Sequence, residues 1–250
     1  MELLLDKQVD LITQLNHSQQ TVKQPIDAMY IRALGLYKSN RFEAAEKLLK
    51  ELLLQKEDYH QARLLLAEVF MAAKQYDEAT SELNTLKATS AYQDYSTEIE
   101  LKQAEIKLIK NQCQQVIDDL KNYQANNLMI NEVKKAKIQL SLGDAYAAMG
   151  NSQKAMQAFN KAIANIDELI NPKIYAQSYY GQGSVLFHNA NDNKVYALFE
   201  QSYVYAKSAA DLPLQAKSLN AMARNKLLQN QWEKSCRVNQ KIYSSDGIDR

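Results

Sequence analysis

The segment ALGLYKSNRFEAAEKLLKEL, residues 33–52, is followed 34 positions later by AEVFMAAKQYDEATSELNTL, residues 67–86. In both copies a small residue begins an apolar segment, a polar break follows, and an aromatic residue opens a second segment carrying an alanine and a leucine. The pattern continues, with inserts, in residues 142–163, 182–202 and 222–242. A period of this length is typical of helical repeats that stack on one another.

Two positions recur in the aligned copies. The first segment carries a small residue at one position: Ala33, Ala67, Ala104, Gly143, Gly183 and Ala223. The second carries a small or β-branched residue and, four residues later, a larger one: Ala45 and Leu49, Ala79 and Leu83, Val116 and Leu120, Ala155 and Phe159, Val195 and Phe199, and Ser235 and Asn239. Antiparallel helices approach closely only where a side chain is nearly absent, so the pattern predicts stacked helical hairpins. The alternative is an ordinary helical bundle whose alanines are in register by chance.

The composition excludes several classes of protein. Hydrophobic residues make up 46% and charged residues 24% of 250 residues, which is typical of a globular protein and not of a disordered chain. The net charge of +1 gives no general attraction to nucleic acid or anionic lipid. No apolar run is long enough to span a bilayer, and the N-terminus lacks the features of a signal peptide, so we expect a cytoplasmic protein.

The repeated pattern resembles the tetratricopeptide repeat (TPR), a helix–turn–helix unit with Phe42 and Tyr76 at its aromatic turn position. The resemblance implies an all-α, right-handed α-solenoid of about six TPR-like repeats. We place the solenoid at residues 25–243, with copies near 26–59, 60–96, 97–135, 136–175, 176–215 and 216–243. The prolines Pro25, Pro172 and Pro213 support these boundaries because each precedes an expected first helix.

The two ends of the chain have different expected roles. Apolar residues on one side of residues 2–20 predict an N-terminal capping helix, with a linker up to residue 24. A dimer contact through this helix is the alternative. At the other end, the polar Ser235 and Asn239 predict that no further repeat follows, and residues 244–250 are expected to form a flexible tail.

No catalytic or cofactor motif is found in the sequence. Phosphate-binding glycine loops, metalloprotease helices, nucleophile elbows and calcium loops are all absent. The three histidines stand apart, and Cys113 and Cys236 form no metal-binding cluster. Cys113 occupies the aromatic turn position of the third copy, where we expect a small buried side chain. We therefore expect no enzymatic activity, no metal and no cofactor.

The resemblance also implies where a partner binds, because the first helices of TPR proteins line a concave groove. Carried onto this chain, the candidate groove residues are Tyr30, Tyr37, Leu64, Glu68, Met71, Glu105, Asp144, Tyr180, Phe187, His188 and Arg224. The residue pattern does not match the carboxylate clamp by which some TPR proteins grip chaperone C-termini. Tyr180 is the first candidate for a contact, because residues 175–205 are rich in tyrosine, a side chain favoured at recognition surfaces.

Charge suggests the chemistry of that partner. Glu68, Glu105 and Asp144 occupy one equivalent position in three successive copies, which suits a peptide bearing lysine or arginine. The alternative is that these acids pair with Arg63, Lys102 or Lys107 on solvated helix faces. Residues 216–243 carry a net charge of +5, but no nucleic-acid-binding pattern accompanies it, so we expect a solvated basic face and no nucleic acid contact.

Three functions follow as hypotheses. Residues 27–49 and HQARLLLAEVF, residues 60–70, are similar to TPR regions that follow winged-helix domains in bacterial membrane regulators of the CadC or ToxR-like kind. That similarity implies the sensor half of a transcriptional regulator, which would lie in the periplasm. The second hypothesis is a stand-alone scaffold for envelope or secretion complexes. The third is a receptor for a small molecule or signal peptide.

Overall fold

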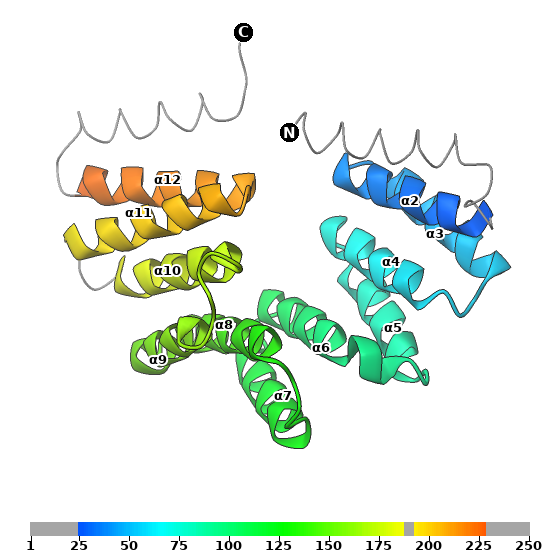
Figure 1. The fold of residues 1–250 in the computed structure, drawn as a ribbon, viewed down its shortest axis with the longest axis horizontal. Coiled ribbons are helices and arrows are strands. Elements are labelled where there is room, and N and C mark those ends of the chain that lie inside the picture. The colour runs from blue at the N-terminus through cyan, green and yellow to red at the C-terminus, as the bar shows by residue number, and fades with distance from the viewer. Residues whose placement is uncertain (1–24, 188–192, 229–250) are drawn as a thin grey trace, which may run out of the picture. The chain divides into compact units, whose positions relative to one another are not determined.

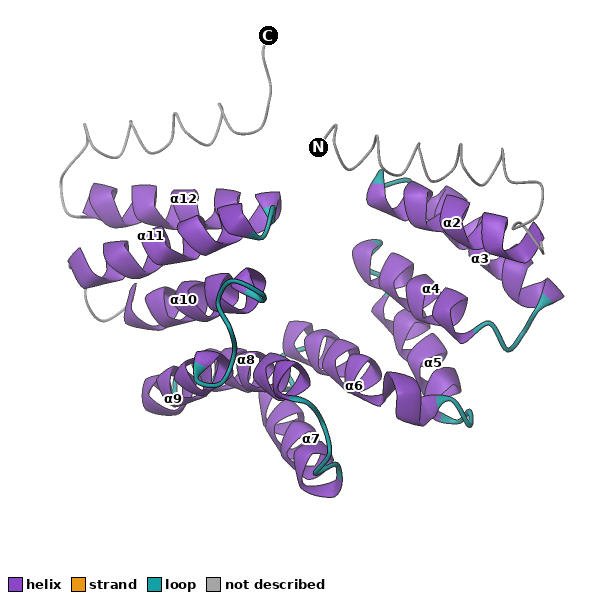
Figure 2. Ribbon diagram, viewed as in Figure 1, coloured by secondary structure: helices purple, strands orange, loops and turns teal. Residues whose placement is uncertain are grey.

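The computed structural model describes residues 25–187 and 193–228, and every regular element among them is an α-helix (Figure 2). The predicted all-α fold is therefore confirmed. The expected capping helix and tail lie outside the described residues, as do His188, Ser235 and Asn239. The chain divides into two compact units, residues 1–99 and 100–250, with the boundary inside α6 (Tyr92–Ile109).

The first unit is built from two helical hairpins and the beginning of α6. Its helices are α2 (Pro25–Lys38), α3 (Phe42–Gln55), α4 (His60–Ala72) and α5 (Tyr76–Lys87). Each packs against the next, and α2 also contacts α4. The first helices of the two hairpins therefore lie side by side (Figure 1).

The second unit continues the same arrangement. Its helices after α6 are α7 (Cys113–Asn126), α8 (Glu132–Ala148), α9 (Ser152–Ile163), α10 (Pro172–Phe187), α11 (Asn193–Ser208) and α12 (Leu212–Leu228). Helix α8 contacts α10, and α10 contacts α12, so these first helices share one side of the unit. Residues of α6, α7 and α8 join in one apolar cluster around Leu120 and Ile138.

The recurring small and large positions form the core in both units. All six small residues of the first helices are buried, and so are the described pairs of the second helices, from Ala45 and Leu49 to Val195 and Phe199. The ring of Phe159 shows why small residues are needed. A Cβ atom added at Gly143 would lie 2.5 Å from this ring, and one added at Gly181 would lie 2.4 Å from it. Two successive first helices are thus held against one aromatic ring by two glycines.

Each turn from first to second helix in the first four hairpins uses a residue in the left-handed region. These residues are Asn40, Lys74, Asn111 and Gly150, with φ values of 58°, 63°, 58° and 73°. The backbone N–H that follows donates to a carbonyl five residues earlier, as from Arg41 to Leu36 at 2.9 Å and from Gln75 to Phe70 at 2.8 Å. This is the Schellman arrangement, which satisfies carbonyls at the helix end. The polar break of the repeat therefore has a defined backbone geometry.

The prolines lie where a helix tolerates them. Pro25 and Pro172 are the first residues of α2 and α10, and Pro213 is the second residue of α12. The first turn has no intrahelical acceptor for a backbone N–H, so the missing donor costs nothing there. Asparagine caps two other first turns: the side chain of Asn131 accepts from Lys134 N, and that of Asn151 accepts from Lys154 N.

Candidate functional site

In each unit, we call the surface formed by the first helices of the hairpins (α2, α4, α6, α8, α10 and α12) the first-helix surface. In the first unit, this surface brings together two of the predicted groove residues. Tyr30 on α2 and Glu68 on α4 are both half-buried. The pKa of Tyr30 is raised by burial, and then by the nearby carboxylate of Glu68 and by Tyr95 on α6. Glu68 and Tyr30 therefore share one environment with Tyr95, at the start of α6.

Two aromatic residues that the sequence pattern did not single out complete this surface. Tyr59, just before α4, lies with its ring centroid 5.5 Å from that of Tyr30, and its hydroxyl donates to Asp27 Oδ1 at 3.1 Å. Burial, and after it the hydrogen bond to Asp27, raise the pKa of Tyr59 to about 12. The ring of His60 lies 6.5 Å from that of Tyr95. Tyr59 was missed because it lies before α4, outside the first-helix positions that the repeat relates.

The other predicted residues of this unit are half-buried and take varied roles. Leu64 and Met71 lie on α4, and neither is part of the fully buried core. The ring of Tyr37, at the end of α2, lies 6.2 Å from that of Phe42 at the start of α3. Tyr37 thus packs across the turn of its own hairpin.

In the second unit, the first-helix surface brings together Glu105 of α6, Asp144 of α8 and Lys217 of α12. Asp144 is solvent-accessible, yet the helices around it desolvate its carboxyl group and raise its pKa to about 6. Lys217 lowers this pKa and the carboxylate of Glu105 raises it, so desolvation and the second acid outweigh the lysine. An ionised Asp144 is consequently held in a place that disfavours its charge.

A second group lies where α10 and α12 meet. The guanidinium carbon of Arg224 is 5.5 Å from the ring centroid of Phe187, which is cation–π geometry. The Phe187 ring in turn lies edge-on to Phe199, at 6.1 Å. The predicted residues Phe187 and Arg224 are therefore in contact, with Arg224 exposed.

Several tyrosines of residues 175–205 pack against other aromatic rings. Tyr180 is half-buried with its ring 5.7 Å from that of Phe199, so it stays a candidate contact residue with only part of its surface free. Tyr179 and Tyr205 stack with an interplanar angle of 13°, and Tyr175 is tilted against both, with the three centroids 5.1 to 6.4 Å apart. The Tyr205 hydroxyl donates to Glu168, which raises the pKa of Tyr205 to about 12.

Two of the three cations that could have neutralised the predicted row of acids are engaged elsewhere. Arg63 pairs with Glu82 at 2.8 Å, and Lys107 pairs with Asp119. The alternative of simple ion pairing is therefore weakened for these two cations. The expected solvated basic face also needs a correction at Lys226: this side chain is buried, and its ammonium lies 4.3 Å from the ring centroid of Tyr196.

Among the described residues, no group of three or more histidine, cysteine, aspartate or glutamate side chains could hold a metal ion. None of the helices in the described ranges is both long enough and apolar enough to cross a membrane. Cys113 is a buried free thiol, as expected for its position.

Comparison with known proteins agrees with the repeat pattern. Residues 36–94 match the tetratricopeptide repeat family. The chain is 31% identical over 167 residues to the "Beta-barrel assembly-enhancing protease" of Escherichia coli K12 and to that of Shigella flexneri. The match covers 62% of this chain, which spans about a third (31%) of the length of these relatives.

Solved structures share the fold at low sequence identity. PilF of Pseudomonas aeruginosa matches with a TM-score of 0.57 and 15% identity, over 90% of this chain and 93% of PilF. BtubC from P. vanneervenii matches with a TM-score of 0.55 and 13% identity, over 91% of this chain and 95% of BtubC. The family match over residues 36–94 and the helical hairpins of the described residues together show a TPR-like, all-α fold.

Proposed function

We propose that this chain is a non-catalytic interaction domain that binds a lysine- or arginine-bearing segment of another protein along its first-helix surface. TPR repeats are protein-interaction repeats, and those predicted contact residues that the structure describes are partly or fully accessible. The observation that carries the proposal is the environment of Asp144, where desolvation and the Glu105 carboxylate disfavour the ionised form despite Lys217.

A cation from a partner would relieve this cost. Lysine or arginine brought beside Asp144 and Glu105 stabilises both carboxylates, so part of the binding free energy comes from restoring the charged state. Binding should then release a proton near pH 6. The affinity for a basic segment should rise as the pH rises through about 6, since only the ionised Asp144 attracts the cation.

Selection from a randomised peptide display library tests this proposal. The wild-type chain should enrich peptides rich in lysine and arginine, and Glu105→Gln with Asp144→Asn should remove that preference. A matched control is Glu78→Gln with Glu200→Gln, which removes the same charge from the second helices α5 and α11. Selected peptides without a basic bias, or equal binding by the Glu105–Asp144 variant, would contradict the proposal.

The identity of the larger assembly is a second part of the proposal. The relative named as a β-barrel assembly-enhancing protease favours a scaffold role in the assembly of a larger complex. Proteolysis in that name belongs to the relative, and our proposal gives this chain no chemistry. The resemblance to CadC- or ToxR-like regulators stays a prediction from the sequence, as do the expected compartment, the dimer contact and the boundaries of the copies.

An immunoblot of the native cells separates the scaffold from the regulator. A band near the 28.5 kDa of this chain would support the scaffold. A complex should then co-purify with the wild type and not with the Glu105–Asp144 variant. A markedly larger band in the membrane fraction would favour the sensor part of a membrane regulator instead.

A further inference from the structure

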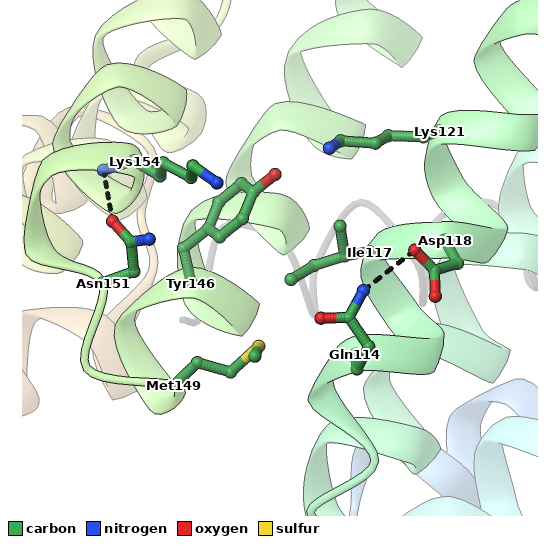
Figure 3. Close-up of a pocket in the computed structure, with 8 residues that line it drawn as sticks. All are labelled: Gln114, Ile117, Asp118, Lys121, Tyr146, Met149, Asn151 and Lys154. Atoms are coloured by element: carbon green, nitrogen blue, oxygen red, sulfur yellow. Dashed lines mark hydrogen bonds between the residues drawn. The ribbon is translucent and has the colours of Figure 1, made fainter.

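A pocket of about 200 Å³ lies in the second unit (Figure 3). Helix α7 forms one wall, and the end of α8 with the beginning of α9 forms the other. The side chains that carry the argument are Gln114, Ile117, Lys121, Tyr146, Met149 and Lys154. Tyr146 follows Asp144 by two residues, which is about 200° around an α-helix. The pocket therefore opens on the opposite side of α8 from the candidate peptide surface.

Two lysines converge on the tyrosine at the centre of this pocket. Lys121 Nζ lies 5.7 Å and Lys154 Nζ lies 5.6 Å from the ring centroid of Tyr146, and both ammonium groups are aimed toward the ring in Figure 3. Within the described part of the chain, neither ammonium has a carboxylate within 4 Å. The one acid of the pocket, Asp118, accepts from the Gln114 amide at 2.9 Å. Two positive charges thus outnumber one negative charge around a single ring.

The walls beside the lysines are partly apolar. Ile117 is buried at 3% exposure, and Tyr146 packs against the apolar clusters on both sides of α8. Met149, by contrast, is 49% exposed at the rim. A ligand here would meet a fixed tyrosine, a flexible thioether and two ammonium groups.

The volume limits what fits. Sites for drug-sized molecules and cofactors usually measure about 300–1,000 Å³. A pocket of about 200 Å³ is suited to one amino-acid side chain. We propose that this pocket binds an acidic side chain of a partner protein, with its carboxylate between Lys121 and Lys154 and its methylene groups against Tyr146 and Met149. The two faces of the second unit would then bind segments of opposite charge.

The test uses methyl NMR of the full chain with isotope-labelled methionine methyl groups. A blocked glutamate-rich peptide should shift the Met149 methyl signal saturably, and a serine-rich peptide of the same length should not. Lys121→Met with Lys154→Met should weaken the glutamate-rich peptide about tenfold or more, since both charge contacts are lost. Methionine keeps the apolar stem over Tyr146, and an unchanged melting temperature verifies the fold of the variant.

Lys161→Met is the matched control, because it removes an exposed lysine from the same helix α9 two turns beyond Lys154. It should bind as the wild type does. Two results would overturn the assignment: a Met149 signal that does not respond to the peptide, or equal binding by the double variant. A titration with inorganic phosphate, followed by the same Met149 methyl signal, is the second part of the test. Saturation of the Met149 shift by phosphate at lower concentrations than by the peptide would also overturn the assignment, in favour of a phosphate ligand.

Discussion

Gly143→Ala is the substitution that tests the packing of the second unit most directly. The added methyl carbon would lie 2.5, 2.7 and 2.8 Å from three carbons of the Phe159 ring. Carbon atoms in contact normally lie about 3.5–4.0 Å apart, so the ring would have to retreat by about 1 Å. Movement toward α10 is blocked, because the same end of the ring, Cε1 and Cζ, already lies so close to Gly181 that an added Cβ there would be 2.4 Å away.

Two opposing effects determine how much Gly143→Ala changes the free energy of unfolding. Replacing glycine by alanine inside a helix gains about 1 kcal/mol in helix propensity. Overpacking a rigid core costs about 1–3 kcal/mol, and the closed site around Phe159 puts this case at the upper end. We therefore expect Gly143→Ala to lower the free energy of unfolding by about 2 kcal/mol, measured by urea unfolding followed with circular dichroism.

Gly35→Ala is the matched control. Gly35 lies within α2, and nothing stands within 4 Å of an added Cβ. This variant should gain only the higher helix propensity of alanine, which stabilises the folded protein by about 1 kcal/mol. Combining Gly143→Ala with Phe159→Leu should cost less than the sum of the two single changes, because the smaller side chain makes room for the methyl group. A Gly143→Ala protein as stable as Gly35→Ala would refute the placement of the ring.

Four further results are expected. Ala67→Leu should destabilise the first unit by about 1–3 kcal/mol in the same assay, because Ala67 is completely buried. Lys74→Gly should stabilise by about 1 kcal/mol in thermal unfolding, because its φ of 63° strains any residue with a Cβ. Asp144→Asn should stabilise by up to about 1 kcal/mol at pH 7, less than its pKa shift implies because solvent screens the exposed group. The native state holds the Asp144 proton up to about pH 6, so wild-type stability falls as the pH rises from about 4 to 6. The stabilisation by Asp144→Asn should therefore vanish below pH 4. Glu168→Gln should lower the Tyr205 pKa from about 12 toward its ordinary value, followed by ultraviolet titration.

The repeat in the sequence predicted the fold and most of its core because repeat contacts recur at a fixed separation along the chain. A small residue in each first helix and a large one in each second helix are related by that period, and both sets are buried in the described residues. The period does not show which large side chain each small residue contacts. That Gly143 and Gly181 hold one ring between them follows from the path of two successive first helices around Phe159.

The period also predicted which helices line the candidate surface, but not which charges meet there. Glu105 and Asp144 occupy equivalent positions, so their proximity was expected from the sequence. Lys217 reaches Asp144 from two hairpins further along the chain, where the repeat relates it to no acid. Long charged side chains make contacts that depend on the angle between helices, and a sequence pattern contains no such angle.

The pocket at Tyr146 depends entirely on tertiary structure. Lys121, Tyr146 and Lys154 stand on three different helices, at separations that match no period of the repeat. In the sequence each lysine is one of many on the solvated face of an amphipathic helix. Packing of α7 beside the turn between α8 and α9 brings both ammonium groups to one ring, because that turn places Lys154 in the first turn of α9, next to the Tyr146 ring.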